Sequence, residues 1–286
     1  MSKVAFVLHF EFDPLDHFVV VARGILEKEG YEVWVGAQAD REHNTEEEVT
    51  IVEKAIATSE LVVTFGGDGT FIYGARIGTP LGIPILGINM GRLGFMTCAN
   101  LQDAPEAMRA WLKGNVSVEE LSVMDVVVDG VKSLAINDMA LVKDVKKNMI
   151  QIEAALDGEE AGVFHADGAL VSTPTGSTAY NASAWGPIVD PRANCLIFNP
   201  LLAHNLASRA LVVPGDTNIE LMVNEPVYVS LDGAQWFDLK AHAIVSCHMS
   251  QMKLKMVRVP GSIKFYQQLR EKLTWGRPLV REGRKN

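Results

Sequence analysis

Short apolar runs alternate with longer amphipathic stretches along the first third of the chain. The apolar runs are rich in β-branched and aromatic residues, which predicts buried strands at residues 4–9, 31–35, 61–65 and 83–88. The amphipathic stretches carry apolar side chains at helical spacing, which predicts helices at residues 14–28, 46–56 and 104–113. This alternation of strands and helices is typical of an α/β domain built on a parallel sheet.

The pattern changes near residue 121, where short strand-like runs are separated by Asp-Gly pairs that favour hairpin turns. We therefore predict an antiparallel, sandwich-like β-rich domain after the α/β domain, with boundaries at 1–120 and 121–260. An amphipathic segment at 262–275 is expected to pack back on the first domain, so that the tail 261–286 completes it. The Asp-Gly pairs start at Asp129, Asp157 and Asp232, and the expected strands are 123–128, 149–156, 220–223, 227–231, 241–247 and 252–259.

The composition is that of a globular protein and disfavours several functional classes. The 286 residues are 48% hydrophobic and 21% charged, and the length suits about two domains. The formal net charge of −9 argues against nucleic acid as a partner. Cys98, Cys195 and Cys247 are widely separated, so neither a zinc site nor a disulfide framework is indicated. Without a signal peptide or an apolar run that suits a membrane span, we expect a cytoplasmic protein with no membrane partner.

One segment combines a buried strand with a glycine-rich turn and a single carboxylate. The strand ends at Gly66 and Gly67, Asp68 follows, and Gly69 and Thr70 lead into a mixed apolar segment. The first two glycines can adopt positive φ and let a ligand approach backbone N–H groups that suit phosphate. A carboxylate there repels phosphate unless it binds a cation or takes a proton, which indicates phosphoryl transfer. Alternatively, Asp68 is a turn residue, and either Asp68 or Thr70 is a candidate cap for the next helix.

A second glycine-spaced loop follows the strand at 83–88. Residues 89–95 combine Asn89 and Arg92 with Gly91 and Gly94. In an open α/β sheet, ligands bind at the loops that follow the carboxyl ends of strands, so we expect both loops to face one crevice. Turn geometry alone would also account for the two glycines.

Two segments of the second domain are not explained by hairpins. Asn137 and Asp138 interrupt an apolar run, and the pair suits either a ribose diol or a turn at the end of a strand. Residues 172–180 concentrate Ser, Thr, Pro and Gly before Tyr180. Their hydroxyl groups can recognise an amide or a purine edge, and Tyr180 can stack on a ring or bond to it. A helix capped at Asn181 or Ser183 is compatible with this function.

Together these motifs resemble the NAD kinase family. Lipid kinases of the same superfamily share the first motif, whereas its combination with 89–95 and 172–180 makes the match strong. The resemblance spans most of the chain, from about Leu61 to Gly276. It rests on residues 66–70 (Gly-Gly-Asp-Gly-Thr), 87–95, 137–138, 167–168, 172–180, 186–188 and 229–233.

The resemblance implies an enzyme that binds NAD in the crevice between its two domains. Such enzymes transfer the γ-phosphoryl group of ATP, or of polyphosphate in some members, to the 2′-hydroxyl of the adenosine ribose, using a divalent metal for which we expect Mg²⁺. NAD and ATP are the implied partners, and further copies of the chain would form a homodimer or homotetramer. The resemblance makes Asp68 the catalytic proton acceptor and leaves the metal ligands unassigned. The implied phosphate loop is Gly66, Gly67, Gly69 and Thr70, and the implied NAD contacts are Asp68, Gly69, Phe95, Asn137, Asp138, Asn148, His165, Asp167, Thr178, Ala179, Tyr180, Asn181, Ala182, Ser183 and Gln235.

The chain departs from the family pattern at three places. His165 stands where many members have arginine, so a contact there would be weaker or pH-dependent. Trp185 precedes the Gly-Pro pair and brings an indole near the expected site. The late Asp-Gly segment leaves open whether Ala234 or Gln235 makes the contact.

Two other functions compete with this interpretation. A lipid or diacylglycerol-type kinase would need an apolar acceptor pocket and a membrane-facing surface, which the charge of −9 and the hydroxyl-rich loop disfavour. A non-catalytic NAD-binding module would bind the dinucleotide without needing Asp68.

Overall fold

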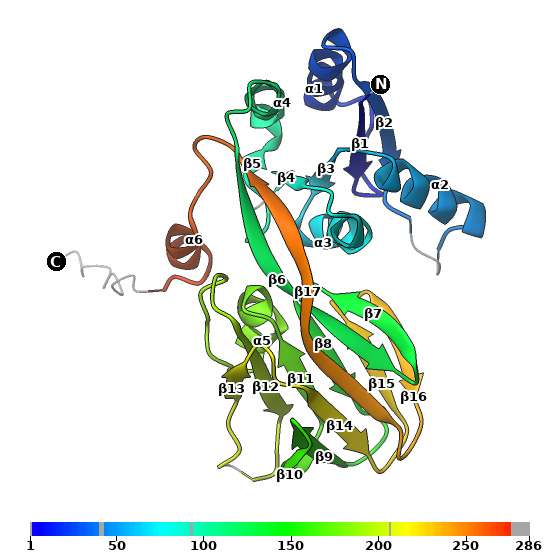
Figure 1. The fold of residues 1–286 in the computed structure, drawn as a ribbon, viewed down its shortest axis with the longest axis vertical. Coiled ribbons are helices and arrows are strands. Elements are labelled where there is room, and N and C mark those ends of the chain that lie inside the picture. The colour runs from blue at the N-terminus through cyan, green and yellow to red at the C-terminus, as the bar shows by residue number, and fades with distance from the viewer. Residues whose placement is uncertain (1, 40–42, 92–93, 206, 276–286) are drawn as a thin grey trace, which may run out of the picture.

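The structure is a computed structural model that describes residues 2–39, 43–91, 94–205 and 207–275. The N-terminal part, drawn from blue to cyan in Figure 1, is a parallel sheet with helices on both faces. Its strands run in the order β2-β1-β3-β4. Its main elements are β1 (Lys3–Leu8), α1 (His17–Lys28), β2 (Glu32–Ala37), α2 (Glu46–Ala57), β3 (Leu61–Gly66), α3 (Asp68–Gly78), β4 (Ile85–Asn89), the short β5 (Ala99–Asn100) and α4 (Ala104–Leu112).

Side-chain caps and apolar faces explain how these helices form and pack. The helix predicted from residue 14 begins at His17 because the Asp16 carboxylate accepts a hydrogen bond from the Phe18 N–H (2.8 Å). Thr45 and Glu48 form a capping box at the start of α2. The apolar sides of α1 and α4 cover one face of the sheet, and those of α2 and α3 cover the other.

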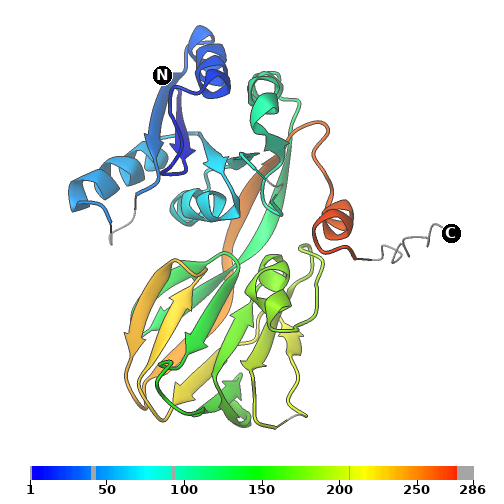
Figure 2. The ribbon, with the colours of Figure 1, turned by 180° about the vertical axis from the view of Figure 1, so that it is seen from behind.

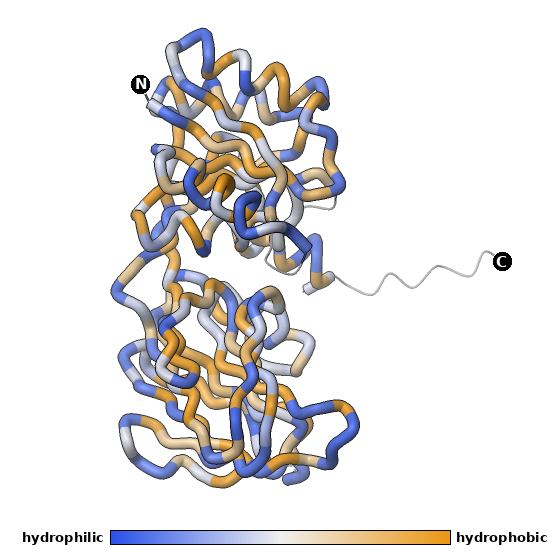
Figure 3. Tube along the Cα trace, turned by 90° about the vertical axis from the view of Figure 1, so that its right-hand side faces the viewer, coloured by the Kyte–Doolittle hydropathy of each residue, from blue (hydrophilic) through white to orange (hydrophobic). Residues whose placement is uncertain are grey.

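The second half of the chain is a sandwich of two largely antiparallel sheets. One sheet has the order β13-β12-β11-β8-β15-β16, and the other contains β10-β9-β14-β17 and continues into the parallel strands. Apolar side chains from both sheets share one core, and Figure 3 shows apolar segments concentrated along these strands. The elements are β6 (Ser117–Val128), β7 (Val131–Ala135), β8 (Asp138–Val142), β9 (Ile150–Leu156), β10 (Glu159–Ala166), β11 (Gly168–Ser172), α5 (Tyr180–Ser183), β12 (Cys195–Leu201), β13 (Leu211–Pro214), β14 (Ile219–Val223), β15 (Val227–Leu231), β16 (Gln235–Leu239), β17 (Ile244–Arg258) and α6 (Phe265–Lys272).

The predicted fold class is confirmed: an α/β part precedes an antiparallel β-rich part. The three Asp-Gly pairs form the predicted hairpins, and each Asp has positive φ. Within the described ranges, no helix combines the length and apolar character that crossing a bilayer requires.

One strand pair connects the two halves, and here the sequence prediction was wrong. Two separate strands were expected at 241–247 and 252–259, but the structure has the single strand β17. β6 pairs with β17 on both sides of a register shift between Met249 and Lys253, and this pairing keeps the strand continuous. β17 also pairs with β14 in one half and with β4 in the other. Residue 121 lies inside β6, so this strand runs through the expected domain boundary.

The C-terminal helix α6 lies beside the junction of the two halves, at the end of the chain segment that follows β17 (Figure 2). It is shorter than the amphipathic segment 262–275 suggested. It contacts the first half, as predicted, through Gln268, and it also contacts the second half through Tyr266. The end of the tail, at residues 276–286, lies outside the described residues.

Candidate active site

Asp68 is the first residue of α3, directly after the strand β3 and the N-cap residue Gly67. Its carboxylate turns to a neighbouring loop, where Oδ2 accepts a hydrogen bond from the Phe95 N–H (2.9 Å) and Oδ1 accepts one from the Met96 N–H (3.0 Å). The Nζ atom of Lys272 lies 3.7 Å from Oδ2. The expectation that Asp68 or Thr70 caps α3 is therefore wrong, because the cap carries no side-chain bond and the carboxylate is used by the loop.

The glycines around Asp68 permit close packing and do not adopt the positive φ that was expected of Gly66 and Gly67. A Cβ atom on Gly66 would collide with the side chain of Thr70, and one on Gly94 would collide with the Asp68 carboxylate. A Cβ on Gly67 would meet open space. Gly94 therefore approaches Asp68, and Gly66 approaches Thr70, at distances that only glycine allows.

The two loops predicted to share a crevice do lie together. The ends of β1, β3 and β4 line a cavity of about 380 Å³. It therefore has the position expected for a ligand site in an open α/β sheet. Residues 92 and 93, including the predicted Arg92, lie outside the described residues. The lining residues are His9, Glu11, Phe12, Gly66, Gly67, Asn89, Met90 and Gly91.

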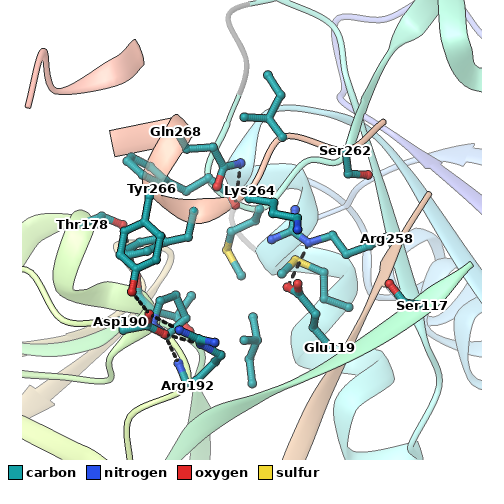
Figure 4. Close-up of a pocket in the computed structure, with 18 of the residues that line it drawn as sticks. Ser117, Glu119, Thr178, Asp190, Arg192, Arg258, Ser262, Lys264, Tyr266 and Gln268 are labelled. Atoms are coloured by element: carbon teal, nitrogen blue, oxygen red, sulfur yellow. Dashed lines mark hydrogen bonds and ion pairs between the residues drawn. The ribbon is translucent and has the colours of Figure 1, made fainter. Parts of the chain in front are cut away.

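A larger cavity of about 630 Å³ lies between the two halves and beneath α6 (Figure 4). Phe95 and Met96 form part of its wall, and Thr175 and Thr178 line it from the hydroxyl-rich segment. The Tyr266 hydroxyl donates to Asp190 (2.7 Å), whose carboxylate also binds the guanidinium of Arg192. The hydrogen bonds from Arg192 hold the pKa of Asp190 well below its usual range.

Asn137 and Asp138 are held in place by the carboxylate of Asp232, which accepts backbone hydrogen bonds from residues 136 to 138 at 2.7 to 3.2 Å. Burial and then the charge of Asp232 raise the pKa of Asp138 to about 7. Burial also raises the pKa of Asp232, although its backbone hydrogen bonds and the guanidinium of Arg76 oppose that shift. Oδ1 of Asn137 is buried and has no hydrogen-bond partner among the described residues.

The hydroxyl-rich segment packs directly on this pair. The Thr173 N–H donates to the Asn137 carbonyl (2.9 Å), and the hydrogen bond of the Tyr180 N–H to Asp138 lowers the pKa of that carboxylate. Asn181 and Ser183 do not cap α5, whose N-cap is Ala179 without a side-chain bond.

The side chain of Asn181 is fully buried, and its Nδ2 donates to the Pro187 carbonyl (2.9 Å). Its Oδ1 accepts a hydrogen bond from Asn199 (3.3 Å). These bonds tie the segment together below the cavity wall, next to Ala182 and Ser183.

Other predicted contacts lie apart from this cluster. Asn148, His165 and Gln235 are exposed, and within the described residues no hydrogen bond joins them to Asp68 or Phe95. Asp167 lies 3.6 Å from the Nζ atom of Lys143. Trp185 is 95% exposed.

Sequence reasoning missed Gln268, Lys272 and Arg76, and it placed Asp232 in a hairpin and in the family motif at 229–233 without assigning a contact to its side chain. Lys264, Gln268 and Lys272 are spaced by four residues, which places a polar stripe along an otherwise amphipathic helix. That stripe was the available signal for a functional face. Nothing local indicated Arg76, because Asp232, the carboxylate whose charge acts on it, lies more than 150 positions later.

No group of three or more His, Cys, Asp and Glu side chains suited to a metal ion occurs in the described part of the chain. Glu11 is the acidic side chain among the residues lining the 380 Å³ cavity. Mg²⁺ is often held by one or two carboxylates together with the phosphates of a substrate, so this donor set fits a metal that arrives with a nucleotide.

Comparisons with known proteins agree with this arrangement. The profile of the ATP-NAD kinase N-terminal domain matches residues 17–116, and that of the ATP-NAD kinase C-terminal domain matches residues 136–259. An NAD kinase from Geotalea daltonii is 37% identical over 228 residues, which cover 76% of this chain and 79% of the relative. An NAD kinase from Heliobacterium modesticaldum is 36% identical over 226 residues, which cover 76% of this chain and 80% of the relative.

Solved structures have the same fold. An Archaeoglobus fulgidus NAD kinase in complex with ATP superposes with a TM-score of 0.73 at 25% identity, covering 96% of this chain and 98% of the other. Yeast NADH kinase in complex with NADH superposes with a TM-score of 0.83 at 20% identity, and the match covers 97% of this chain and 89% of the yeast chain. On the profile matches and the identity to these relatives, the chain belongs to the NAD kinase family.

Proposed function

We propose that this protein is an NAD kinase that transfers the γ-phosphoryl group of ATP to the 2′-hydroxyl of the adenosine ribose of NAD, with Asp68 as the general base. The observation that carries the proposal is that Asp68 joins residues that line two different cavities. Gly66 and Gly67 line the smaller cavity immediately before Asp68. Phe95 and Met96 line the larger one and bind its carboxylate through their N–H groups.

In this arrangement the two substrates approach Asp68 from different sides. The phosphates of ATP occupy the 380 Å³ cavity at the strand ends, where backbone N–H groups and the N-terminus of α3 favour anions. NAD occupies the 630 Å³ cavity between the halves, with Phe95 and Thr178 along its wall. The superposed A. fulgidus enzyme binds ATP, which supports ATP as the donor. The yeast enzyme was solved with NADH and supports a dinucleotide acceptor.

The chemistry requires a base, because a sugar hydroxyl is a weak nucleophile. The carboxylate of Asp68 accepts the proton of the 2′-hydroxyl as the new oxygen–phosphorus bond forms and the bond from the γ-phosphorus to the bridging oxygen breaks. ADP leaves with the electrons of that bond, and NADP carries the phosphoryl group. A positioned general base typically contributes about 10²–10⁴ to the rate. The remaining acceleration comes from holding the reacting groups in line and neutralising the phosphate charge.

Ribose recognition is assigned to Asn137 and Asp138. The partnerless Oδ1 of Asn137 can accept a hydrogen bond from a ligand hydroxyl, and the carboxylate of Asp138 can accept another. Gly69, Ala179, Tyr180 and the more distant predicted contacts remain proposals for the rest of the dinucleotide.

Mg²⁺ enters this scheme as the counter-ion of the ATP phosphates, with Glu11 in the lining of that cavity and Asp68 directly after its lining residue Gly67. When bound, the metal neutralises charge on the phosphates. The use of polyphosphate as donor, a homodimeric or homotetrameric state, and a cytoplasmic location complete the proposal.

The test is a direct assay for product. The purified protein is incubated with NAD and Mg-ATP, and NADP is measured with an NADP-specific dehydrogenase. We expect one NADP to form for each ATP and each NAD consumed. A chain that binds NAD but forms no NADP with ATP or polyphosphate would contradict the proposal and favour a binding module. Phosphorylation of diacylglycerol in place of NAD would favour the lipid kinase.

A further inference from the structure

The C-terminal helix α6 contacts both the carboxylate of Asp68 and the loop that binds it. The Nζ atom of Lys272 lies 3.7 Å from Oδ2 of Asp68 and 4.4 Å from the centre of the Phe95 ring. Gln268, one turn earlier, is 1% exposed, and its Nε2 donates to the carbonyls of Gly94 (3.1 Å) and Phe95 (3.3 Å). The helix therefore binds the loop through its carbonyl groups, while the N–H groups of the same loop region bind Asp68.

These contacts restrict the ammonium group of Lys272 in two directions. The face of the Phe95 ring attracts the cation, and the carboxylate of Asp68 attracts it from a second side. The side chains of Lys272 and Asp68 are 26% and 33% exposed, and an ion pair with this degree of solvent access adds little to folding stability. The contact therefore matters for the position of the Asp68 carboxylate and not for folding stability.

α6 is itself fixed to the other half of the molecule. The Tyr266 hydroxyl donates to Oδ2 of Asp190 (2.7 Å), so the helix is held at the larger cavity as well as at the Asp68 loop (Figure 4). The helix is therefore held by Tyr266 at one half and by Gln268 at the other, and these two contacts fix the backbone that carries Lys272.

We propose that Lys272 is a positioning residue for phosphoryl transfer, which acts by fixing the carboxylate of Asp68 against the Phe95 loop, with Gln268 fixing the loop itself. This inference rests on the proposed function of Asp68 as the base. Each carboxylate oxygen already accepts one backbone N–H, and each has a second lone pair, so a site for the hydroxyl proton remains. The ammonium group favours the rotation of the carboxylate in which Oδ2 lies beside both Lys272 and the Phe95 N–H.

The experiment compares the full-length variants Lys272→Met, Lys272→Arg and Arg270→Met in the NADP assay, each with Asp68 and with Asp68→Asn. Arg270 is the matched control, because it is an exposed cation in the same last turn of α6 and its replacement removes the same charge. We expect Lys272→Met to lower kcat about 10- to 100-fold, the range in which displacing a reacting group by about 1 Å falls. The KM values for NAD and ATP and the melting temperature should stay near those of the unmodified chain.

A residue that acts through Asp68 gives non-additive losses. Lys272→Met should therefore cost less than about threefold in kcat when Asp68 is already asparagine, and Lys272→Arg should recover most of the lost activity. Unchanged kcat in Lys272→Met overturns the inference, as does an equal loss in both backgrounds or a loss confined to the KM for ATP. If Asp68→Asn alone leaves turnover intact, the proposed role of Asp68 fails instead, so the two failures are distinguishable.

Discussion

Replacing Asp68 by asparagine tests the proposed chemistry most directly, because the change removes one carboxylate oxygen and leaves the shape of the side chain nearly intact. In the structure each oxygen accepts one backbone N–H, from Phe95 and from Met96. The amide of asparagine has one acceptor oxygen, so one of these N–H groups would face the amide nitrogen and lose its partner. Leaving such a donor unsatisfied costs about 1–3 kcal/mol. For a protein of this size the melting temperature should fall by roughly 2–12 °C.

The catalytic effect should be much larger than the structural one. Loss of a general base lowers turnover by about 10²–10⁴. We expect kcat for NADP formation to fall by this factor, while the dissociation constant for NAD, measured by calorimetry, changes less than about threefold because the ribose contacts at Asn137 and Asp138 remain. Asp103→Asn, an exposed acidic position at the start of α4, serves as the control and should keep full activity.

Two results would refute this reasoning. Turnover of Asp68→Asn within threefold of the unmodified chain would remove Asp68 from the mechanism. A loss of turnover that is matched by an equal loss of NAD affinity would make Asp68 an anchor for the Phe95 loop, in keeping with its two hydrogen bonds, and would leave the base unassigned.

Three further changes test neighbouring parts of the site. Burial raises the pKa of Asp138 to about 7, so the folded chain keeps a proton that the unfolded chain loses at lower pH; stability should fall as pH rises from about 4 to about 7. In Asp138→Asn, the unfolding free energy measured with urea should no longer show this decrease with pH. The unmodified chain should bind NAD more tightly as pH rises from about 6 to about 8, and Asp138→Asn should not. Asp232→Asn should cost about 1–3 kcal/mol in unfolding free energy and raise the KM for NAD, because the amide nitrogen would replace the Oδ2 atom that accepts a hydrogen bond from the Ile136 N–H and would set a donor against that N–H. Gly94→Ala should lower kcat at least about 10-fold and cost about 1–3 kcal/mol in thermal unfolding, because its Cβ would displace the carboxylate of Asp68.

Local sequence pattern predicted much of this fold because the relevant physics is local. Periodic apolar positions specified the helices and buried strands, and the Asp-Gly pairs specified the three hairpins. The glycine turn after β3 predicted a candidate site around Asp68, and in the structure the Asp68 carboxylate accepts a hydrogen bond from the Phe95 N–H. The sequence analysis divided β17 wrongly because the continuity of this strand depends on its pairing with β6, which lies more than 100 positions earlier in the chain.

The parts of the site that sequence did not predict all depend on contacts between distant segments. Gln268 binds carbonyl groups 173 and 174 positions earlier in the chain, and Asp232 binds N–H groups 94 to 96 positions earlier. An Asp-Gly pair specifies a turn whether or not its carboxylate is used elsewhere. Residue type alone therefore gave no reason to assign Asp232 a second role.

Charged groups also connect the two halves of the molecule at the site. Asp68 and Arg76 lie on the same helix, eight positions or about 12 Å apart along its axis. The guanidinium of Arg76 acts on Asp232, and Asp232 holds the backbone of Asn137 and Asp138. A shift of one half relative to the other would therefore move Arg76 away from the carboxylate on which its charge acts. Helix α3 thus carries the proposed base, Asp68, at its start and Arg76 two turns later. Because Arg76 acts on the carboxylate that holds the proposed ribose-binding segment, this one helix relates the position of the base to that of the ribose contacts.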